Sequence, residues 1–151
     1  MSHAVARVRE EDLGDLLPLV RAYCDFYGAG PSDEDLIALS RALLADPERD
    51  GLQLLGRDAG GRAQGFATVY WTWDTLGARR IGVMYDLFVA PAARGSGLAD
   101  ALVGACADES RGRGIGELTW ETAPGNGRAQ AVYDRMGAAR SEWIAYSLEV
   151  R

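Results

Sequence analysis

Hydrophobic positions change their spacing several times along the chain, and each change predicts a new element. Alternating hydrophobic and polar residues, or short apolar runs between turn residues, predict strands, whereas apolar positions three and four residues apart predict helices. We expect strands over 4–9, 51–58, 61–73, 79–91, 115–122 and 142–150, and helices over 10–28, 31–47, 95–114 and 126–138. The predicted order is β-α-α-β-β-β-α-β-α-β.

This order predicts an α/β fold of the α+β type with a central mixed sheet. The strands on either side of the turn residues 58–62 form a hairpin, and the later β-α-β crossover adds a parallel strand. Helices are then expected on both faces of the sheet. Pro18 interrupts the first helical pattern, so either the regular helix begins later than residue 10 or the helix is kinked. Ser32 has the position of an N-cap for the second helix.

The length of 151 residues and the hydrophobic content of 48% fit one domain with a sizeable core, so we expect a single domain over 1–151. The chain has no apolar run of about 18 residues, the length that a membrane helix needs. The first residues also lack the apolar core of a secretion signal. We therefore expect a cytoplasmic protein without a membrane partner.

Charge and the rarest side chains exclude several classes of function. The net charge is −6, with 22 acidic and 16 basic residues, and no basic stripe predicts binding to nucleic acid. His3 is the single histidine, which argues against a Ser–His–Asp triad and against a zinc site with paired histidines. Cys24 and Cys106 lie in helical apolar segments, and we expect free thiols there rather than a disulfide.

The junction between the fourth predicted strand and the third predicted helix reads ARGSGLAD, residues 93–100. A helix start offers unpaired backbone N–H groups and partial positive charge, glycines allow close approach of a ligand, and Arg94 adds a guanidinium suited to phosphate oxygens. The glycine spacing fits neither a Walker loop nor the dinucleotide-binding fingerprint. The junction therefore predicts either a phosphate site or an ordinary strand-to-helix turn.

Three segments together resemble the GNAT superfamily of N-acetyltransferases. VAPAARGSGLADALV, residues 89–103, resembles the family's acetyl-CoA-binding segment, with its pattern Arg/Gln-x-x-Gly-x-Gly/Ala. LTWETAPGNGRAQAVYDRMGA, residues 118–138, resembles its later strand and helix, and EWIAYSL, residues 142–148, resembles the closing strand of the spermidine/spermine and thialysine acetyltransferase branch. The resemblance covers essentially the whole chain and implies an acyltransferase of the GNAT fold that uses acetyl-CoA and no metal.

The resemblance also implies which residues hold the co-substrate. Backbone groups at the end of the fourth strand would pair with the pantetheine arm, the following loop and helix start would hold the pyrophosphate, and an asparagine would bond the arm. These residues are Leu87, Phe88, Val89 and Ala90 for the strand, Arg94, Gly95, Ser96, Gly97, Leu98, Ala99 and Asp100 for the loop, and Asn126. A turn-forming role for Asn126 is the alternative.

For catalysis, the resemblance implies direct transfer with Tyr133 as the general acid beside the thioester sulfur. A phenol with an ordinary pKa of about 10 is protonated at neutral pH and can donate to the departing sulfur. The alternative for Tyr133 is packing of an amphipathic helix. A backbone N–H of the strand 87–89 can polarise the thioester carbonyl in the manner of an oxyanion hole.

The acceptor amine needs a base, because an alkyl ammonium with a pKa near 10 is neutral only about once in a thousand at pH 7. Polyamine-type relatives often carry Glu where this chain has Tyr85, which leaves Asp86 and Glu121 as candidates. Alternation points Asp86 away from the side of Tyr85 unless a bulge re-aims it. The expected acceptor-binding residues are Tyr23, Tyr27, Tyr85, Asp86 and Glu121, and Trp71 with Trp73 would form a further wall.

These observations predict an acetyl-CoA-dependent N-acetyltransferase that acts on a primary amine of a small, cationic acceptor. Acceptors of the same fold could instead be a protein α-amino group, a lysine or an aminoglycoside. A third class is a CoA-binding module without catalysis. Relatives of the resembled branch are commonly homodimers, so we expect a homodimer.

Overall fold

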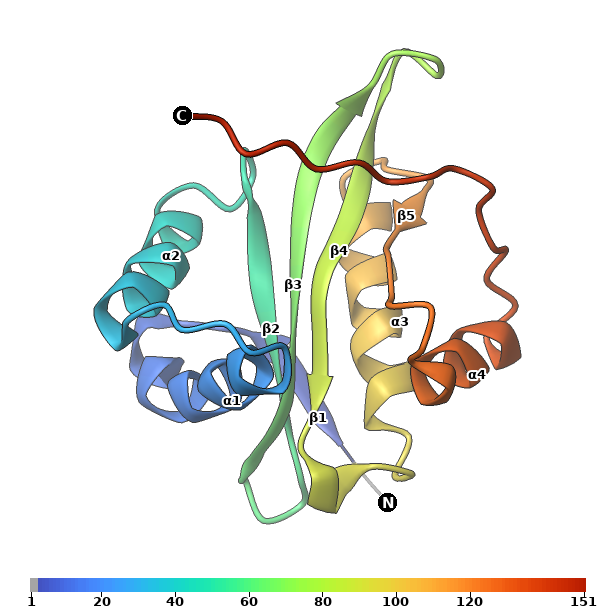
Figure 1. Ribbon diagram of the computed structural model, residues 1–151. Coiled ribbons are helices and arrows are strands. Elements are labelled where there is room, and N and C mark those ends of the chain that lie inside the picture. The colour runs from blue at the N-terminus through green and yellow to red at the C-terminus, as the bar shows by residue number, and fades with distance from the viewer. Residues whose placement is uncertain (1–2) are drawn as a thin grey trace. The chain divides into compact units, whose positions relative to one another are not determined.

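The computed structural model describes residues 3–151, and the chain divides into two compact units (Figure 1). The first unit ends at Glu121, and the second spans Thr122–Arg151. The single domain over 1–151 stays a prediction.

The first unit is built on a five-stranded sheet in the order β1-β2-β3-β4-β5. The pairs from β1 to β4 are antiparallel, and β5 joins β4 in parallel. The predicted mixed sheet is therefore confirmed. The strands are β1 (Ala4–Arg7), β2 (Gly51–Arg57), β3 (Ala63–Asp74), β4 (Arg79–Val89) and β5 (Leu118–Thr119), so β5 is much shorter than the predicted 115–122.

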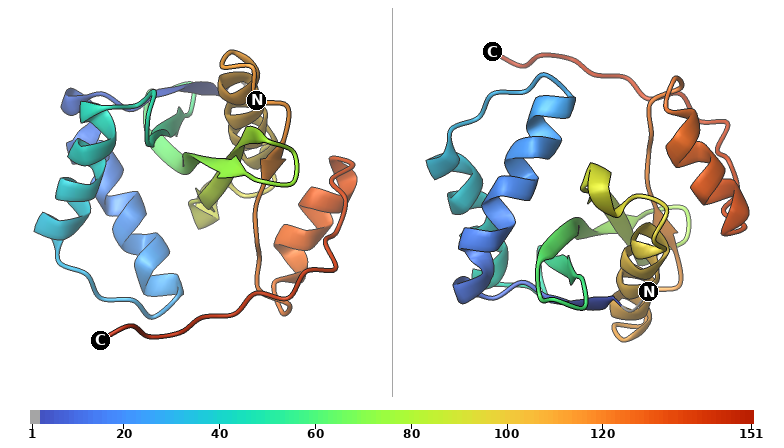
Figure 2. Two further views of the ribbon diagram at one scale, coloured as in Figure 1. Left: turned by 90° about the horizontal axis from the view of Figure 1, so that it is seen from above. Right: turned by 90° about the horizontal axis from the view of Figure 1, so that it is seen from below.

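Helices cover both faces of this sheet, as predicted (Figure 2). One face lies under α1 (Leu13–Phe26) and α2 (Asp33–Ala45), and the other lies under α3 (Leu98–Arg111). We call them the α1/α2 face and the α3 face. The core on the α1/α2 face contains Leu16, Leu19, Leu55, Phe66 and Phe88, which share one cluster of buried side chains.

The helix boundaries follow local signals. The regular helix begins at Leu13, later than the predicted residue 10, and α1 continues through Pro18. A short 3-10 turn, Glu10–Asp12, precedes α1, and Gly28 follows its end with a φ of 69°. Ser32 caps α2 as predicted, because its side chain accepts from the backbone N–H of Asp35 at 3.1 Å.

The second unit contains α4 (Gly127–Arg135) and an irregular segment after it. The predicted strand over 142–150 is wrong, since these residues have no regular secondary structure and Trp143, Ile144 and Tyr146 are exposed. Alternation describes the side chains of a strand, but a strand also needs a partner edge for its backbone N–H and C=O groups. Within Thr122–Arg151 no other strand offers one.

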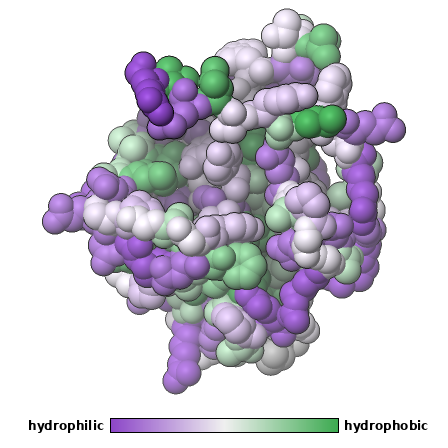
Figure 3. All heavy atoms as spheres, in the orientation of Figure 1, coloured by the Kyte–Doolittle hydropathy of each residue, from purple (hydrophilic) through white to green (hydrophobic). Residues whose placement is uncertain are grey.

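Further features of the described part agree with the composition. Hydrophilic residues and residues of intermediate hydropathy occupy most of the face in Figure 3, and hydrophobic residues form separate small areas. In residues 3–151, no helix is long and apolar enough to cross a bilayer. Cys24 and Cys106 are both free thiols, as predicted.

Candidate active site

The centre of β4 carries one extra residue relative to β3. Asp86 lies opposite Thr68, but Met84 lies opposite the next β3 residue, Val69, which leaves Tyr85 without a partner in the ladder. This is a β-bulge, and it interrupts the alternation of side chains along β4. The bulge that the sequence left open is present at Tyr85, and it brings neighbouring residues to the same face.

Asp86 lies half-buried on the α1/α2 face, where its carboxylate accepts hydrogen bonds from the hydroxyls of Thr68 and Tyr23. Burial is the largest influence and raises the pKa of Asp86 above its ordinary value, while the two hydrogen bonds lower it and offset part of that shift. The Tyr23 ring packs edge-on against Phe66 and Phe88, with centroids 5.6 and 6.1 Å away. A carboxylate with a raised pKa in such surroundings is a suitable proton acceptor.

Tyrosines surround this carboxylate. Tyr70 and Tyr85 have ring centroids 5.4 Å apart, and Tyr23 and Tyr27 have centroids 5.1 Å apart. Burial, with smaller contributions from the charges of Asp86 and Tyr85, raises the pKa of Tyr70 to about 12, so its phenol stays protonated at neutral pH. Tyr85 and Tyr27 are 69% and 52% exposed, so an acceptor from solvent can reach them. A carboxylate with aromatic rings around it attracts an ammonium group by charge and by cation–π contact.

The start of α3 is open toward a ligand. Gly95 and Gly97 have φ values of 79° and 89°, and Gly97 caps the helix without a side-chain hydrogen bond. Among the described residues, the backbone N–H groups of Gly95, Gly97, Leu98 and Ala99 donate to no other protein group. A Cβ at either glycine would meet no atom within 4 Å, so there is open space beside both glycines. This segment, residues 94–99, is called the phosphate cradle below, because free N–H groups at a helix start are suited to bind phosphate.

Two side chains form hydrogen bonds at the cradle. Arg94 donates from Nε to the carbonyl of Val89 at 3.3 Å and is exposed. His3 Nε2 donates to the carbonyl of Ser96 at 2.9 Å. The histidine that the sequence excluded from catalytic triads thus contacts the middle of the cradle.

The edge of β4 next to the cradle lacks a partner strand. β5 pairs with β4 only at Gly82 and Val83, so the two strands separate before Leu87. Ala90 donates its N–H to Gln64 on the β3 side, and alternation then directs the backbone groups of Leu87 and Val89 to the open edge. Of the predicted residues 87–90, these two offer backbone groups to an added strand, whereas the Phe88 side chain is buried in the core.

The second unit holds the two remaining predicted site residues. Asn126 is the N-cap of α4, and its Oδ1 accepts from the backbone N–H of Ala129 at 3.2 Å. The side-chain nitrogen of Asn126 is a separate hydrogen-bond donor, so the capping role and the predicted cofactor role use different atoms. Tyr133 lies half-buried on the same helix, and the following residue, Asp134, pairs at 2.7 Å with Arg140 beyond the end of the helix.

The structure therefore brings together Tyr23, Tyr27, Tyr85 and Asp86, but it does not add Glu121 to this group. Glu121 is exposed, two residues beyond the end of β5. The predicted tryptophan wall is also wrong. Trp71 is buried on the α3 face, where its indole N–H donates to Pro47 and the Arg113 guanidinium lies over its ring at 4.8 Å, whereas Trp73 is 75% exposed.

Sequence reasoning missed Thr68, Tyr70 and His3. Tyr70 is next to Trp71 in β3, and alternation shows that the two side chains face opposite ways but not which one faces the site. A polar residue such as Thr68 inside an apolar strand was the available signal. In residues 3–151, no cluster of three or more His, Cys, Asp or Glu side chains is placed to hold a metal ion.

Comparisons with known proteins agree with this geometry. The sequence model of the Acetyltransferase (GNAT) family matches residues 16–138. An uncharacterized N-acetyltransferase of Bacillus subtilis strain 168, YhfO, is 28% identical over 147 residues, which are 97% of each chain. A solved structure of a probable acetyltransferase is 25% identical with a TM-score of 0.83, covering 100% of this chain and 99% of the other. Aminoglycoside N-acetyltransferase AAC(6')-Iy in complex with CoA shares the fold at 20% identity, with a TM-score of 0.84 over 98% and 95% of the two chains.

Proposed function

Because the chain belongs to the Acetyltransferase (GNAT) family, we propose that it transfers the acetyl group of acetyl-CoA directly to a primary amine of a small, cationic acceptor. The observation that carries the proposal is the order of the functional groups along residues 85–99. The Asp86 carboxylate beside the bulge, the open edge of β4 at residues 87–89 and the phosphate cradle follow one another in the same unit.

Residues of the first unit would hold acetyl-CoA, which supplies the activated thioester when bound. The N–H groups from Gly95 to Ala99, with the Arg94 guanidinium, would bind the pyrophosphate oxygens. Backbone groups of Leu87 and Val89 would align the pantetheine arm as an added strand, and one of their N–H groups would polarise the thioester carbonyl. Ser96, Asp100, Phe88 and Ala90 shape the same segment. The family resemblance implies that Asn126, which belongs to the second unit, bonds the arm.

On the acceptor side, we assign the base to Asp86. Its raised pKa and its contact with hydroxyl groups alone leave the carboxylate able to take the proton of an ammonium group. Tyr23, Tyr27, Tyr70 and Tyr85 would flank the acceptor and favour a cation over an anion. We also propose a homodimer in the cytoplasm, and among GNAT members we place the chain with the spermidine/spermine and thialysine branch.

The first experiment measures acetyl-CoA binding by thermal unfolding. Ligand at about a hundred times its Kd should add roughly 2.7 kcal/mol of stability. Gly97→Val should abolish the melting shift, because its side chain would occupy the space in front of the cradle. Gly114→Val is the matched control, since Gly114 also has a positive φ, 72°, and open space but follows the far end of α3. A normal shift in folded Gly97→Val would place the cradle elsewhere.

Thiol release from acetyl-CoA with a panel of acceptors then tests the reaction. Small diamines should exceed neutral and acidic amines, while a peptide α-amine, a lysine peptide or an aminoglycoside in first place would select the corresponding alternative. Binding without any thiol release would indicate a CoA-binding module.

Tyr133→Phe tests the assigned general acid. The variant should keep its affinity for acetyl-CoA and lose turnover by roughly 10² to 10⁴, the usual range for such a group. Steady-state kcat and the melting shift with acetyl-CoA measure the two effects. Unchanged turnover would remove Tyr133 from the mechanism.

A further inference from the structure

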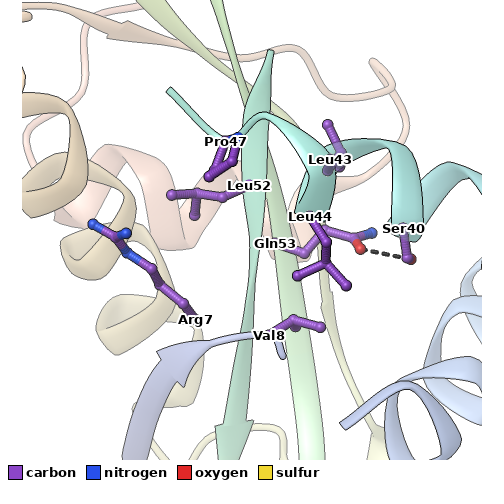
Figure 4. Close-up of a pocket in the computed structure, with 8 residues that line it drawn as sticks. All are labelled: Arg7, Val8, Ser40, Leu43, Leu44, Pro47, Leu52 and Gln53. Atoms are coloured by element: carbon purple, nitrogen blue, oxygen red, sulfur yellow. Dashed lines mark hydrogen bonds between the residues drawn. The ribbon is translucent and has the colours of Figure 1, made fainter. Parts of the chain in front are cut away.

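A chain of buried polar side chains crosses the α1/α2 face and ends at Asp86. Ser40 of α2, Gln53 of β2 and Thr68 of β3 are only 3%, 5% and 0% exposed. Ser40 Oγ lies 2.7 Å from Gln53 Oε1, and Gln53 Nε2 lies 3.2 Å from Thr68 Oγ1. Figure 4 shows the first of these hydrogen bonds among the apolar side chains between α2 and β2.

The chemistry of each atom fixes the direction of this chain. An amide oxygen only accepts, so Ser40 donates to Gln53, and an amide nitrogen only donates, so Gln53 donates to Thr68. The Thr68 oxygen thereby accepts one hydrogen bond, and its own proton is left for the Asp86 carboxylate, to which Thr68 is hydrogen-bonded. All three donors therefore point toward the negative charge.

The side-chain amide of Gln53 could take a second orientation, with its oxygen and nitrogen exchanged. If it were turned around, its oxygen would accept the Thr68 proton, and Asp86 would lose a donor. The Ser40 hydroxyl, which donates to the amide oxygen at 2.7 Å, could also accept from the amide nitrogen, so the ionised Asp86 carboxylate favours the observed orientation because it can only accept the Thr68 proton. Aligned hydrogen bonds in a buried site also strengthen one another.

We propose that Ser40, Gln53 and Thr68 are positioning residues that hold a hydroxyl donor on Asp86 and thereby set the pH range in which this carboxylate is ionised. The proposal rests on the proposed function, because it concerns the residue assigned as the base. Its substance is the protonation of Asp86, which can be measured without any turnover.

The groups around Asp86 leave this titration easy to interpret. Among the described residues, Tyr23 of α1 and Tyr70 of β3 are titratable side chains that interact with it, Tyr85 precedes it in β4, and Tyr27 packs against Tyr23. Phenols ordinarily titrate near pH 10, far above a carboxylate. A change of the apparent Asp86 titration in the acid and neutral range therefore reports its hydrogen bonds and burial.

The experiment follows the Asp86 carboxyl carbon by NMR against pH in Thr68→Val, Gln53→Met and Ser40→Ala. Thr68→Val keeps the shape of the side chain but removes the donor, and its titration should move up by about 1 pH unit. Gln53→Met should give a smaller upward shift and Ser40→Ala the smallest. The low-pH limb of the kcat/KM profile should move with the NMR titration.

Ser110→Ala is the matched control. Ser110 is a buried serine, 2% exposed, whose hydroxyl donates to the Cys106 carbonyl under the α3 face, and its loss should leave the Asp86 titration unchanged. Thr68→Ser keeps the hydroxyl and should restore the wild-type titration. If Thr68→Val does not fold, the Gln53→Met and Ser40→Ala titrations decide instead.

The outcomes separate the two proposals. If none of Thr68→Val, Gln53→Met and Ser40→Ala shifts the Asp86 titration, the positioning role is overturned. The same holds if Ser110→Ala shifts the titration equally. A shifted NMR titration with an unchanged kcat/KM profile supports the positioning role and overturns Asp86 as the base.

Discussion

Asp86 and Glu109 are two carboxylates withdrawn from water on opposite sides of one sheet, and their pKa values move in opposite directions. Asp86 lies on the α1/α2 face, and Glu109 belongs to α3, which covers the other face. Burial is the largest single influence on each carboxyl and by itself would raise the pKa of each. The pKa of Asp86 stays raised, whereas the combined effect of Arg7 and Arg113 lowers that of Glu109.

The difference lies in the charge of the partners. Glu109 accepts from the guanidinium of Arg7 at 2.7 Å through both oxygens, and from Arg113 at 2.7 Å. Arg113 is itself buried against Trp71. Within residues 3–151, the hydrogen bonds that Asp86 accepts come from the neutral hydroxyls of Thr68 and Tyr23. Charged donors roughly double the strength of a hydrogen bond, so Glu109 is held as an ion, whereas Asp86 retains an affinity for a proton.

The same distinction separates a structural clamp from a reactive group. The pairs of Glu109 tie β1 to α3 and, through Arg113 and Glu48, to the loop before β2. Such pairs fix geometry but leave no proton affinity in the neutral range. Asp86 is hydrogen-bonded to neutral hydroxyl groups, and its surroundings suit proton transfer.

The largest expected effect is the loss of turnover in Asp86→Asn. The amide keeps the size of the side chain but cannot accept the ammonium proton, so kcat should fall by roughly 10² to 10⁴ while the melting shift with acetyl-CoA persists. Steady-state kinetics and thermal unfolding measure the two effects. A variant that retains full turnover would leave the base unassigned.

Thermal unfolding of the same variant against pH tests the raised pKa of Asp86. A carboxyl whose pKa is higher in the folded state than in the unfolded chain binds the proton more tightly when folded, so stability falls as pH rises through this interval. Asp86→Asn should therefore be more stable than the wild type at neutral pH, with a difference that shrinks on acidification. A wild type that is the more stable at neutral pH would contradict the raised pKa.

The second effect is a loss of stability in Glu109→Gln with no loss of turnover per folded molecule. Hydrogen bonds to charged groups contribute about 1.5 to 3 kcal/mol, and Arg113 would lose one of its two carboxylate partners and keep only Glu48. The lowered pKa of Glu109 means that its contribution is present above the unfolded value and disappears as pH falls through the folded value.

Asp108→Asn is the control for this stability loss. Asp108 pairs with Arg111 at 2.6 Å, but both side chains are about three-quarters exposed, so its removal should cost about 0 to 1 kcal/mol. Urea unfolding measures the free energy of unfolding of the wild type, Glu109→Gln and Asp108→Asn. A Glu109→Gln variant that unfolds like the wild type, or loses turnover as Asp86→Asn does, would remove the contrast between the two carboxylates.

The smallest effect concerns the rim of the acceptor site. Tyr27 packs edge-on against Tyr23, with the centroids 5.1 Å apart, and remains 52% exposed. A cation–π contact there contributes about 0.5 to 2 kcal/mol, so Tyr27→Ala should raise the amine KM several-fold and leave the affinity for acetyl-CoA unchanged. A loss of both affinities together would make Tyr27 a packing residue.

The sequence by itself determined the order of elements in the first unit and the position of the glycine junction. Periodicity, the Ser32 cap and the glycines at 95 and 97 act within a few residues, and such local signals are readable along the chain. The same local reasoning failed for 142–150, because a strand depends on a partner edge as well as on alternation. It also made β5 too long.

Only the tertiary structure decided which side chains share the face of Asp86. The bulge at Tyr85 arises from the register between β3 and β4, and register is a property of the pair. Alternation separates Tyr70 from Trp71 but does not say which of them faces α1. Ser40, Gln53 and Thr68 come from three different elements, so their hydrogen bonds, and the pKa of Asp86 with them, exist only once those elements have packed together.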